Sequence, residues 1–436
     1  MERKEIWAGQ ADAWRRVIPE AEERIARVRR GEGRIVVTDA EGHPVPDAHL
    51  TISQTNHAFR HGANIFMLDE MESDEKNALY RERFAAAFNM ATLPFYWDTL
   101  EPTEGKPRYA KDSPKVYRRP APDLCIEYCR AHGIEPREHA LAYDHFFPTW
   151  LRGRSDAEVK CLLEKRMAEI SERYAALIPT IEVTNEMAWW DGITDFYHAD
   201  DFMPWCFETA EKYFPHNKLG INEFGMFDTR MGKWSAYWLQ IEKLLHLGRR
   251  IDLIGMQNHL FVPREKEADI ASHFYNPDNV WKVLCDFADL GPALEISEIT
   301  FPAYSGAAED EEFQATVLEH LYTLWFSHPR MEHAIYWNLV DGYAFGAKQG
   351  DMTAGENYYH GGLLRFDLSP KPAYERLVYL FREHWHTEAQ ATSDASGRAA
   401  FCGFFGDYHV TAEKNGHTIS ANVTLSKENG DIHIIL

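Results

Sequence analysis

The chain has 436 residues, of which 46 are Lys or Arg and 68 are Asp or Glu, so its formal net charge is −22. This acidity argues against nucleic acid and anionic membranes as partners, and it permits a neutral ligand such as a sugar. No apolar run approaches the roughly 18 residues of a membrane span, and the length suits one large domain with an accessory.

The N-terminal stretch MERKEIWAGQADAWRR lacks the continuous apolar segment of a secretory signal. The six cysteines are scattered and show no disulfide-framework spacing. Both features predict a cytoplasmic protein, and secretion stays open if a signal peptide has been removed.

The sequence pattern of the first sixty residues changes once, from helical to strand-like. Residues 3–30 predict a charged amphipathic helix. In residues 33–59, Val and Ile alternate with polar residues around the turn-forming sequence DAEGHPVPDA, which predicts two strands of a small β element.

From about residue 60 to 385, short apolar runs alternate with helical stretches such as SDAEVKCLLEKRMAEISERYAAL. The eight runs are HGANIF, FNMATLPF, PREHALAY, PTIEVTNE, KLGINEFG, IDLIGMQNH, PALEISEIT and HAIYWNLVD. This alternation predicts a parallel sheet, and its length suits a (β/α)8 TIM barrel. Nearly every run ends in polar residues, and the carboxyl ends of barrel strands build the active site.

Residues 388–436 alternate again and are punctuated by Gly, Asp and Asn, which predicts further strands. We expect them to form one accessory β-sandwich with the N-terminal strands. The predicted division is therefore 1–60 for the N-terminal helix and accessory strands, 61–387 for the barrel and 388–436 for the remaining accessory strands. A structural cap is the expected role of this sandwich, with a glycan-binding module as the alternative.

Two glutamates follow apolar runs directly: Glu186 after IEVTN and Glu298 after ALEIS. Either carboxylate alone could be a helix cap or a surface charge. At the ends of two barrel strands, however, they would face one cavity, and paired carboxylates are what glycoside hydrolysis requires.

Further polar and aromatic side chains end other runs and converge on the same predicted face. They are His139, Tyr143 and Asp144, then Asn222 and Glu223, then Gln257 and His259, and finally Trp337, Asn338 and Asp341. The sequence has no HExxH, GxSxG, P-loop or GxGxxG motif. A metal-dependent hydrolase built from the His and Asp residues stays open as a minor alternative.

These residues stand in motifs, and the region 60–385 resembles glycoside hydrolase family 10, the endo-β-1,4-xylanase family of retaining (β/α)8 barrels. The motifs are VTNEM, INEFG, IGMQNHL, ISEITF, HALAYDHFFPTWL and LLRFDLSPKPAYERL. The resemblance implies that Glu186 is the acid/base and Glu298 the nucleophile, with the carboxyl groups roughly 5–5.5 Å apart. It implies no metal and no organic cofactor.

The resemblance also implies the substrate contacts. Asn185 would bond the sugar 2-hydroxyl, His259 would hold Glu298 ionised with Gln257 beside it, and His139 and Trp337 would line the same subsite. We expect Tyr96, Trp97 and Tyr143 to contact the sugar as well.

The chain departs from the family where sugars on the non-reducing side are normally held. In TLPFYW, the positions of a Glu, an Asn and a Lys are taken by Thr92, Leu93 and Tyr96, while Trp97 is kept. Loss of polar side chains that hydrogen-bond a sugar lowers the affinity or changes which sugar hydroxyl is recognised. The expected function is therefore a retaining hydrolase of xylan-type or xylo-oligosaccharide substrates. The alternatives are an exo-acting or side-chain-specific β-glycosidase on another plant-derived glycoside, and a non-catalytic carbohydrate-binding protein.

Two tryptophans, Trp189 and Trp190, follow the acid/base motif. They could form a wall for the leaving group, because aromatic faces stack on sugars, or they could simply pack. The partner expected is an oligosaccharide or polysaccharide, with no nucleic acid and no membrane, and the oligomeric state stays open.

Overall fold

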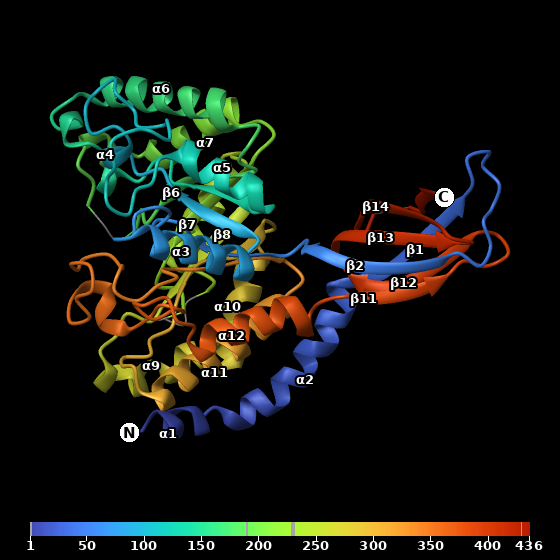
Figure 1. The fold of residues 1–436 in the computed structure, drawn as a ribbon. Coiled ribbons are helices and arrows are strands. Elements are labelled where there is room, and N and C mark those ends of the chain that lie inside the picture. Colours follow the sequence, from blue (N-terminus) through green and yellow to red (C-terminus); the bar gives the residue numbers. More distant parts are fainter. Residues whose placement is uncertain (1, 189–190, 228–231, 429) are drawn as a thin grey trace.

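The computed structural model describes residues 2–188, 191–227, 232–428 and 430–436. Its main body is a closed barrel of eight strands, each parallel to its neighbours, in which the last strand pairs with the first (Figure 1). The strands are β3 (Arg60–Asn64), β4 (Met90–Pro94), β5 (Glu135–His139), β6 (Thr180–Asn185), β7 (Lys218–Glu223), β8 (Leu253–His259), β9 (Ala293–Thr300) and β10 (Met331–Tyr336). The eight predicted runs supply these strands, and the predicted TIM barrel is confirmed.

Helices surround the barrel, so its strands are buried on both faces, as parallel sheets require. They are α3 (Asp74–Ala87), α4 (Trp97–Leu100), α5 (Pro122–His132), α6 (Asp156–Tyr174), α7 (Phe202–Tyr213), α8 (Ala236–His246), α9 (Glu267–Phe274), α10 (Pro277–Ala288), α11 (Ala308–Ser327) and α12 (Pro372–Tyr379). The shorter helical elements are the 3₁₀ helices η1 (Asp144–Phe146), η2 (Thr149–Leu151), η3 (Asp195–His198), η4 (Arg264–Lys266) and η5 (Gly355–Tyr359), and the π-helix η6 (Leu380–His384). In the described part of the chain, no helix combines the length and apolar character needed to cross a bilayer.

The predicted N-terminal helix is two helices, α1 (Arg3–Ala8) and α2 (Ala11–Val28), which run along the outside of the barrel (Figure 1). The indole Nε1 of Trp14 donates to the Tyr275 carbonyl at 2.8 Å. Arg3 is buried, and its guanidinium pairs with Glu267 at 2.8 Å. These contacts attach the N-terminal helices to the barrel wall.

The accessory strands form two sheets whose inner faces share a core, so the predicted β-sandwich is confirmed. One sheet has the order β12–β1–β15 and the other β11–β2–β13–β14. The strands are β1 (Arg30–Thr38), β2 (His49–His57), β11 (Glu388–Thr392), β12 (Arg398–Phe404), β13 (Gly406–Lys414), β14 (His417–Leu425) and β15 (Ile432–Ile435). Alternating apolar side chains such as Ile35, Ile52, Phe401 and Val410 fill the space between the sheets.

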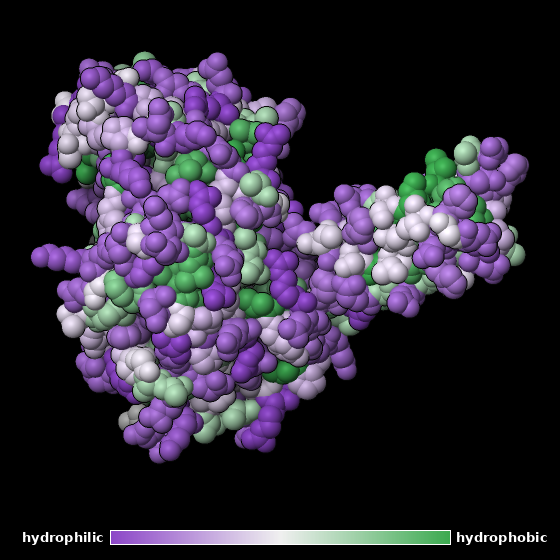
Figure 2. Space-filling model, viewed as in Figure 1, coloured by the Kyte–Doolittle hydropathy of each residue, from purple (hydrophilic) through white to green (hydrophobic). Residues whose placement is uncertain are grey.

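The sandwich is attached where the barrel strands begin. Strand β2 ends at His57 and β3 begins at Arg60. The Nδ2 of Asn89, which directly precedes β4, donates to the Asn56 side chain at 2.9 Å. The sandwich therefore lies at the opposite end of the barrel from the carboxyl ends of the strands. It projects from the barrel as a separate lobe whose visible surface mixes hydrophilic and hydrophobic residues (Figure 2). The division at residues 60 and 387 stays a prediction.

Candidate active site

A cavity of about 740 Å³ opens at the carboxyl ends of the barrel strands. Nine of the ten predicted site residues line it: Tyr96, His139, Tyr143, Asn185, Glu186, Gln257, His259, Glu298 and Trp337. They come from strands spread around the barrel, so the closed sheet brings together residues that are far apart in the chain.

The tenth predicted residue, Trp97, lies outside this cavity, which differs from the expectation. Its indole is 2% exposed and packs edge-on against Phe147 and Trp150. Its Nε1 donates to the Glu101 carboxylate at 2.8 Å. Trp97 begins helix α4, so its side chain turns into the surrounding core instead of toward the barrel axis.

Glu186 follows the last residue of β6, and its backbone has a φ of 53°. Non-glycine residues rarely adopt this left-handed conformation, and such strain is concentrated at functional sites. The Nε2 of Gln257 donates to Oε1 of Glu186 at 2.8 Å, and the Tyr143 hydroxyl donates to Oε2. The two donors come from different strand ends and fix the carboxyl group in the cavity.

Glu298 lies on β9 and is held by donors from two other barrel strands. The Nδ2 of Asn222 on β7 donates to Oε1 at 2.9 Å, and the Nε2 of His259 on β8 is 3.1 Å from Oε2. Burial raises the pKa of the Glu298 carboxyl well above its usual range; the His139 charge opposes this rise and the nearby Glu186 carboxyl adds to it. The donors from Asn222 and His259 favour the ionised form.

Asn222 links the two glutamate-bearing strands. Its Nδ2 also donates to Oδ1 of Asn185 at 2.8 Å, while its Oδ1 accepts from the Ser297 hydroxyl at 2.5 Å. The sequence marked Asn222 as a polar strand end but gave no signal for this bridging position. The amide fixes the relative orientation of Asn185 and Glu298.

Beneath the cavity, a fully buried ionic network supports His139. The Nδ1 of His139 is 2.8 Å from Glu182, and Arg137 lies 2.5 Å from both Glu182 and Glu295. Burial alone would lower the pKa of His139, but the Glu182 carboxylate outweighs it and raises that pKa. The other nitrogen, Nε2, is 2.9 Å from the Tyr96 hydroxyl, so the network reaches the cavity through the imidazole.

The divergent TLPFYW segment contributes only Tyr96 to the cavity lining. Thr92 and Leu93 are both 0% exposed, and the Thr92 hydroxyl has no hydrogen-bond partner among the described residues. The two positions that resemble polar sugar contacts in the family therefore belong to the packed barrel here.

Several other polar strand-end residues have structural contacts. Asp144 is buried and accepts from the backbone N–H of Thr194 at 3.1 Å. Asp341 pairs with Lys371 at 2.6 Å. Glu223 accepts from the backbone N–H of Ala188 at 2.8 Å, and burial raises its pKa to about 8.

Sequence reasoning missed part of the cavity wall, which comes from loops without periodicity. These residues include Phe66, Arg118, Arg119, Phe146, Phe261, Phe345, Glu356 and Tyr359. The sequence offered one signal, the adjacent pair Arg118-Arg119, but the pattern alone could not place it at the barrel mouth. Trp189 and Trp190, considered above as a wall, lie outside the described residues.

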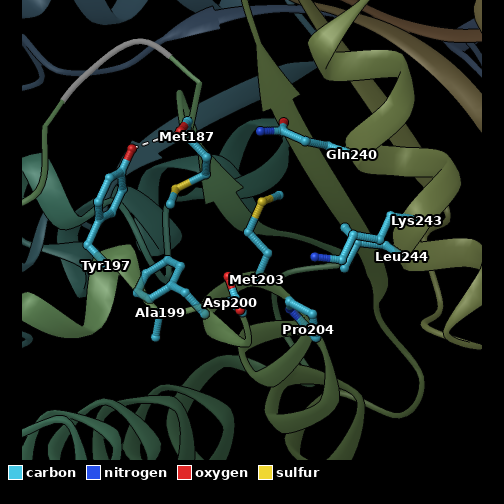
Figure 3. Close-up of a pocket in the computed structure, with 10 residues that line it drawn as sticks. Met187, Tyr197, Ala199, Asp200, Met203, Pro204, Gln240, Lys243 and Leu244 are labelled. Carbon is cyan, nitrogen blue, oxygen red and sulfur yellow. Dashed lines mark hydrogen bonds between the residues drawn. The ribbon is translucent and has the colours of Figure 1, made fainter. Parts of the chain in front are cut away.

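A second cavity of about 240 Å³ lies between the loop after β6 and helices α7 and α8 (Figure 3). It is lined by Met187, Met203 and Lys243 among others, and the Tyr197 hydroxyl donates to the Met187 carbonyl at 2.8 Å. Among the described residues that line it, Asp200 is the one carboxylate. Within the described residues, the one group spaced to hold a metal ion is Asp39, Glu41 and His43, at an exposed turn of the sandwich.

A comparison with family models decides how this cavity is classified. The model of Glycosyl hydrolase family 10 matches residues 58–379, which is most of the chain and contains every residue of the cavity. The chain belongs to glycosyl hydrolase family 10. The resemblance found in the sequence motifs is thereby confirmed.

Relatives of this family 10 chain are distant. Anti-sigma-I factor RsgI6 of Acetivibrio thermocellus is 24% identical over 95% of this chain and 49% of that protein. Endo-1,4-beta-xylanase C of Paenibacillus barcinonensis is 23% identical over 74% of this chain and 31% of that protein. The chain thus spans half or less of the length of these two relatives. Native xylanase 10B from Thermotoga maritima shares the fold, with a TM-score of 0.60 and 19% identity over 75% of this chain and 96% of that one.

Proposed function

We propose that this chain is a retaining glycoside hydrolase that cleaves β-glycosidic bonds in xylan-type substrates or xylo-oligosaccharides. The observation that carries the proposal is the placement of Glu186 and Glu298 on one cavity, each fixed by donors from other barrel strands. A carboxylic acid and a carboxylate on opposite sides of a glycosidic bond are what double displacement needs.

In this proposal Glu298 attacks the anomeric carbon while Glu186 protonates the departing oxygen. Water, deprotonated by Glu186, then releases the sugar from Glu298. The carboxyl of Glu298 receives hydrogen bonds from Asn222 and His259, which supports its role as the ionised partner.

Asn185 is suited to hold the sugar at the cleavage point. Its Oδ1 accepts from Asn222 at 2.8 Å and from Gln257 at 3.4 Å. Its Nδ2 has no partner among the described residues and lines the cavity, which supports a bond from Nδ2 to the sugar 2-hydroxyl. A hydrogen bond at that hydroxyl strengthens in the transition state.

The substrate class rests on relatives. Endo-1,4-beta-xylanases of several organisms match this chain, and solved structures that share its fold include complexes with xylobiose and xylotriose. The replacement of the polar positions 92 and 93 by packed residues favours short or decorated substrates over plain polymeric xylan.

Product analysis on polymeric xylan, xylo-oligosaccharides and small aryl β-glycosides tests this proposal, with Glu298→Ala as the control. We expect activity on the oligosaccharides and none in the variant. Mid-chain cutting of xylan would show that the changed TLPFYW segment still allows polymeric xylan to bind. Equal product formation by Glu298→Ala would overturn the catalytic assignment.

Carbohydrate binding without turnover is the second candidate. It is favoured by the match to a protein named an anti-sigma-I factor, which extends over 95% of this chain and therefore includes the sandwich. The two candidates differ in a single-turnover experiment: binding of xylo-oligosaccharides without any released product, in wild type and Glu298→Ala alike, would favour the second.

A further inference from the structure

Two adjacent arginines, Arg118 and Arg119, line the cavity that holds Glu186 and Glu298. Both are buried, with exposed fractions of 5% and 8%. They belong to the long segment between α4 and α5. Burying a guanidinium is costly unless an acceptor compensates for the lost water, so each of these side chains needs a partner.

Neither guanidinium has a carboxylate within 4.0 Å among the described residues, whereas the buried Arg3 and Arg137 both do. In the described part of the chain, the Arg118 guanidinium donates to neutral groups, the side-chain oxygen of Asn338 at 3.1 Å and the carbonyl of Tyr343. These bonds hold Arg118 in place without neutralising its charge.

Arg119 is less satisfied than the comparable arginines of this chain. Arg108 and Arg166 are also buried and also lack a carboxylate, but each donates to three backbone carbonyls. The Arg119 guanidinium makes a single hydrogen bond to the described residues, from Nη1 to the Arg118 carbonyl at 3.0 Å. Within the described residues its Nη2 donates to no acceptor, although a guanidinium carries five N–H donors.

Aromatic rings fix the plane of the Arg119 guanidinium beside the catalytic cluster. It lies over the Tyr96 ring at 4.0 Å and near the Phe66 ring at 5.2 Å. Tyr96 in turn contacts His139 through its hydroxyl at 2.9 Å. A stacked guanidinium presents its edge, the geometry that receives a carboxylate in a fork.

We propose that Arg119, with Arg118 behind it, binds the carboxylate of a uronic acid residue, so that the preferred ligand is an acidic oligosaccharide. This inference rests on the proposed function insofar as a glycan must occupy the cavity. It places the anionic group against the wall formed by Phe66 and Tyr96, next to the sugar that is cleaved.

The acidic groups near Arg119 do not pair with its guanidinium. Oε2 of Glu356 accepts from the Asn338 amide at 2.7 Å. The charges of Asp98 and Glu356 raise the pKa of Arg119, but by less than burial lowers it, and neither carboxylate forms an ion pair with Arg119. Burial lowers the pKa of the Arg119 guanidinium, and the adjacent Arg118 charge lowers it further. A bound carboxylate offsets both effects, whereas a neutral sugar hydroxyl offsets neither.

Binding calorimetry on the full chain carrying Glu298→Gln tests the proposal without any need for turnover. The ligands are a glucuronic-acid-substituted xylo-oligosaccharide and the same molecule with its carboxyl group reduced to an alcohol. We expect the acidic ligand to bind about tenfold more tightly, because a charge-assisted fork is lost on reduction. Adding Arg119→Gln should bring the ratio to about one. The matched control Arg27→Gln, at an exposed site on α2, should keep the tenfold preference for the acidic ligand.

Equal affinity for the two ligands in the protein with Arg119 intact overturns the inference, whether or not Arg119→Gln folds. Survival of the preference in a folded Arg119→Gln variant overturns it as well. Tighter binding of a sulfate-ester analogue than of the uronic acid would contradict a carboxylate as the preferred ligand group and indicate a sulfate instead. If the neutral and acidic ligands bind equally well, this inference alone is wrong. If no ligand binds, the proposed substrate class is wrong as well.

Discussion

At the scale of single residues, the carboxyl groups of Glu186 and Glu298 differ in the donors that hold them. Glu186 is bound by the Tyr143 hydroxyl and the Gln257 amide, while Glu298 is bound by the Asn222 amide and the His259 ring. The proposed roles of acid and nucleophile require different environments for the two carboxyls, and these donor sets are different. The roles can therefore be separated by substitution.

Removal of the proposed acid should depend on the leaving group. Glu186→Ala should lower kcat on xylo-oligosaccharides by about 10²–10⁴-fold, the usual contribution of general acid–base catalysis. The same variant should form the glycosyl-enzyme normally from an aryl glycoside with an acidic phenol, which departs without a proton. Pre-steady-state release of the phenol measures this step, and an equal loss on both substrates would contradict the assignment.

A second residue-scale prediction concerns stability. The Thr92 hydroxyl is buried in β4 without a partner among the described residues. Thr92→Val keeps the shape and removes the unsatisfied group, so the free energy of unfolding should stay equal or rise by about 1 kcal/mol. Urea unfolding measures it. A loss of more than about 1 kcal/mol would mean that the hydroxyl has a partner, such as a water.

At the scale of elements, Glu223 couples the end of β7 to the loop after β6. Its carboxyl accepts from the backbone N–H groups of Ala188 and Phe224, and so holds the segment that follows Glu186. Burial is the main cause that raises its pKa from 4.5 to about 8. This loop should therefore respond to pH.

The sign of that response follows from proton binding. Between pH 4.5 and about 8 the folded state keeps the Glu223 proton while the unfolded state loses it, so stability falls as pH rises through this window. Relative to Glu223→Gln, the wild-type free energy of unfolding should drop by about 5 kcal/mol across it. Parallel urea titrations of both proteins check this; a constant difference would show that Glu223 has the same pKa in the folded and unfolded states.

The elements were predictable because each barrel strand carries its own signal. Runs such as IEVTNE and ALEISE are apolar over the strand and end in the residue that enters the cavity, so Glu186 and Glu298 could be located from the sequence. Trp97 was misplaced because its position depends on where β4 gives way to α4. Arg118 and Glu356 lie in loops whose path depends on tertiary contacts, which no local periodicity encodes.

At the scale of the whole molecule, the sandwich and the candidate active site occupy opposite ends of the barrel. The sandwich core, which includes Ile52, is separate from the barrel core that includes Ile181. Contacts between the two parts are made by Asn56, His57 and Asn89, where the barrel strands begin. Stability of the sandwich and chemistry in the cavity should therefore be separable.

A matched pair of core substitutions tests this separation. Ile52→Ala in β2 and Ile181→Ala in β6 both remove a fully buried side chain and should each cost about 2–5 kcal/mol. Only Ile181→Ala should also lower kcat/KM on short xylo-oligosaccharides, because β6 carries Glu186. An equal loss of kcat/KM in Ile52→Ala would mean that the sandwich contributes to catalysis.

The central claim is that Glu186 and Glu298 hydrolyse a β-glycoside by double displacement. The most direct measurement is a proton NMR time course of xylo-oligosaccharide hydrolysis, which resolves the anomer released before mutarotation. The account predicts that the β-anomer forms first in the wild type and that Glu298→Ala forms no product. First release of the α-anomer, or product from Glu298→Ala at the wild-type rate, would contradict it.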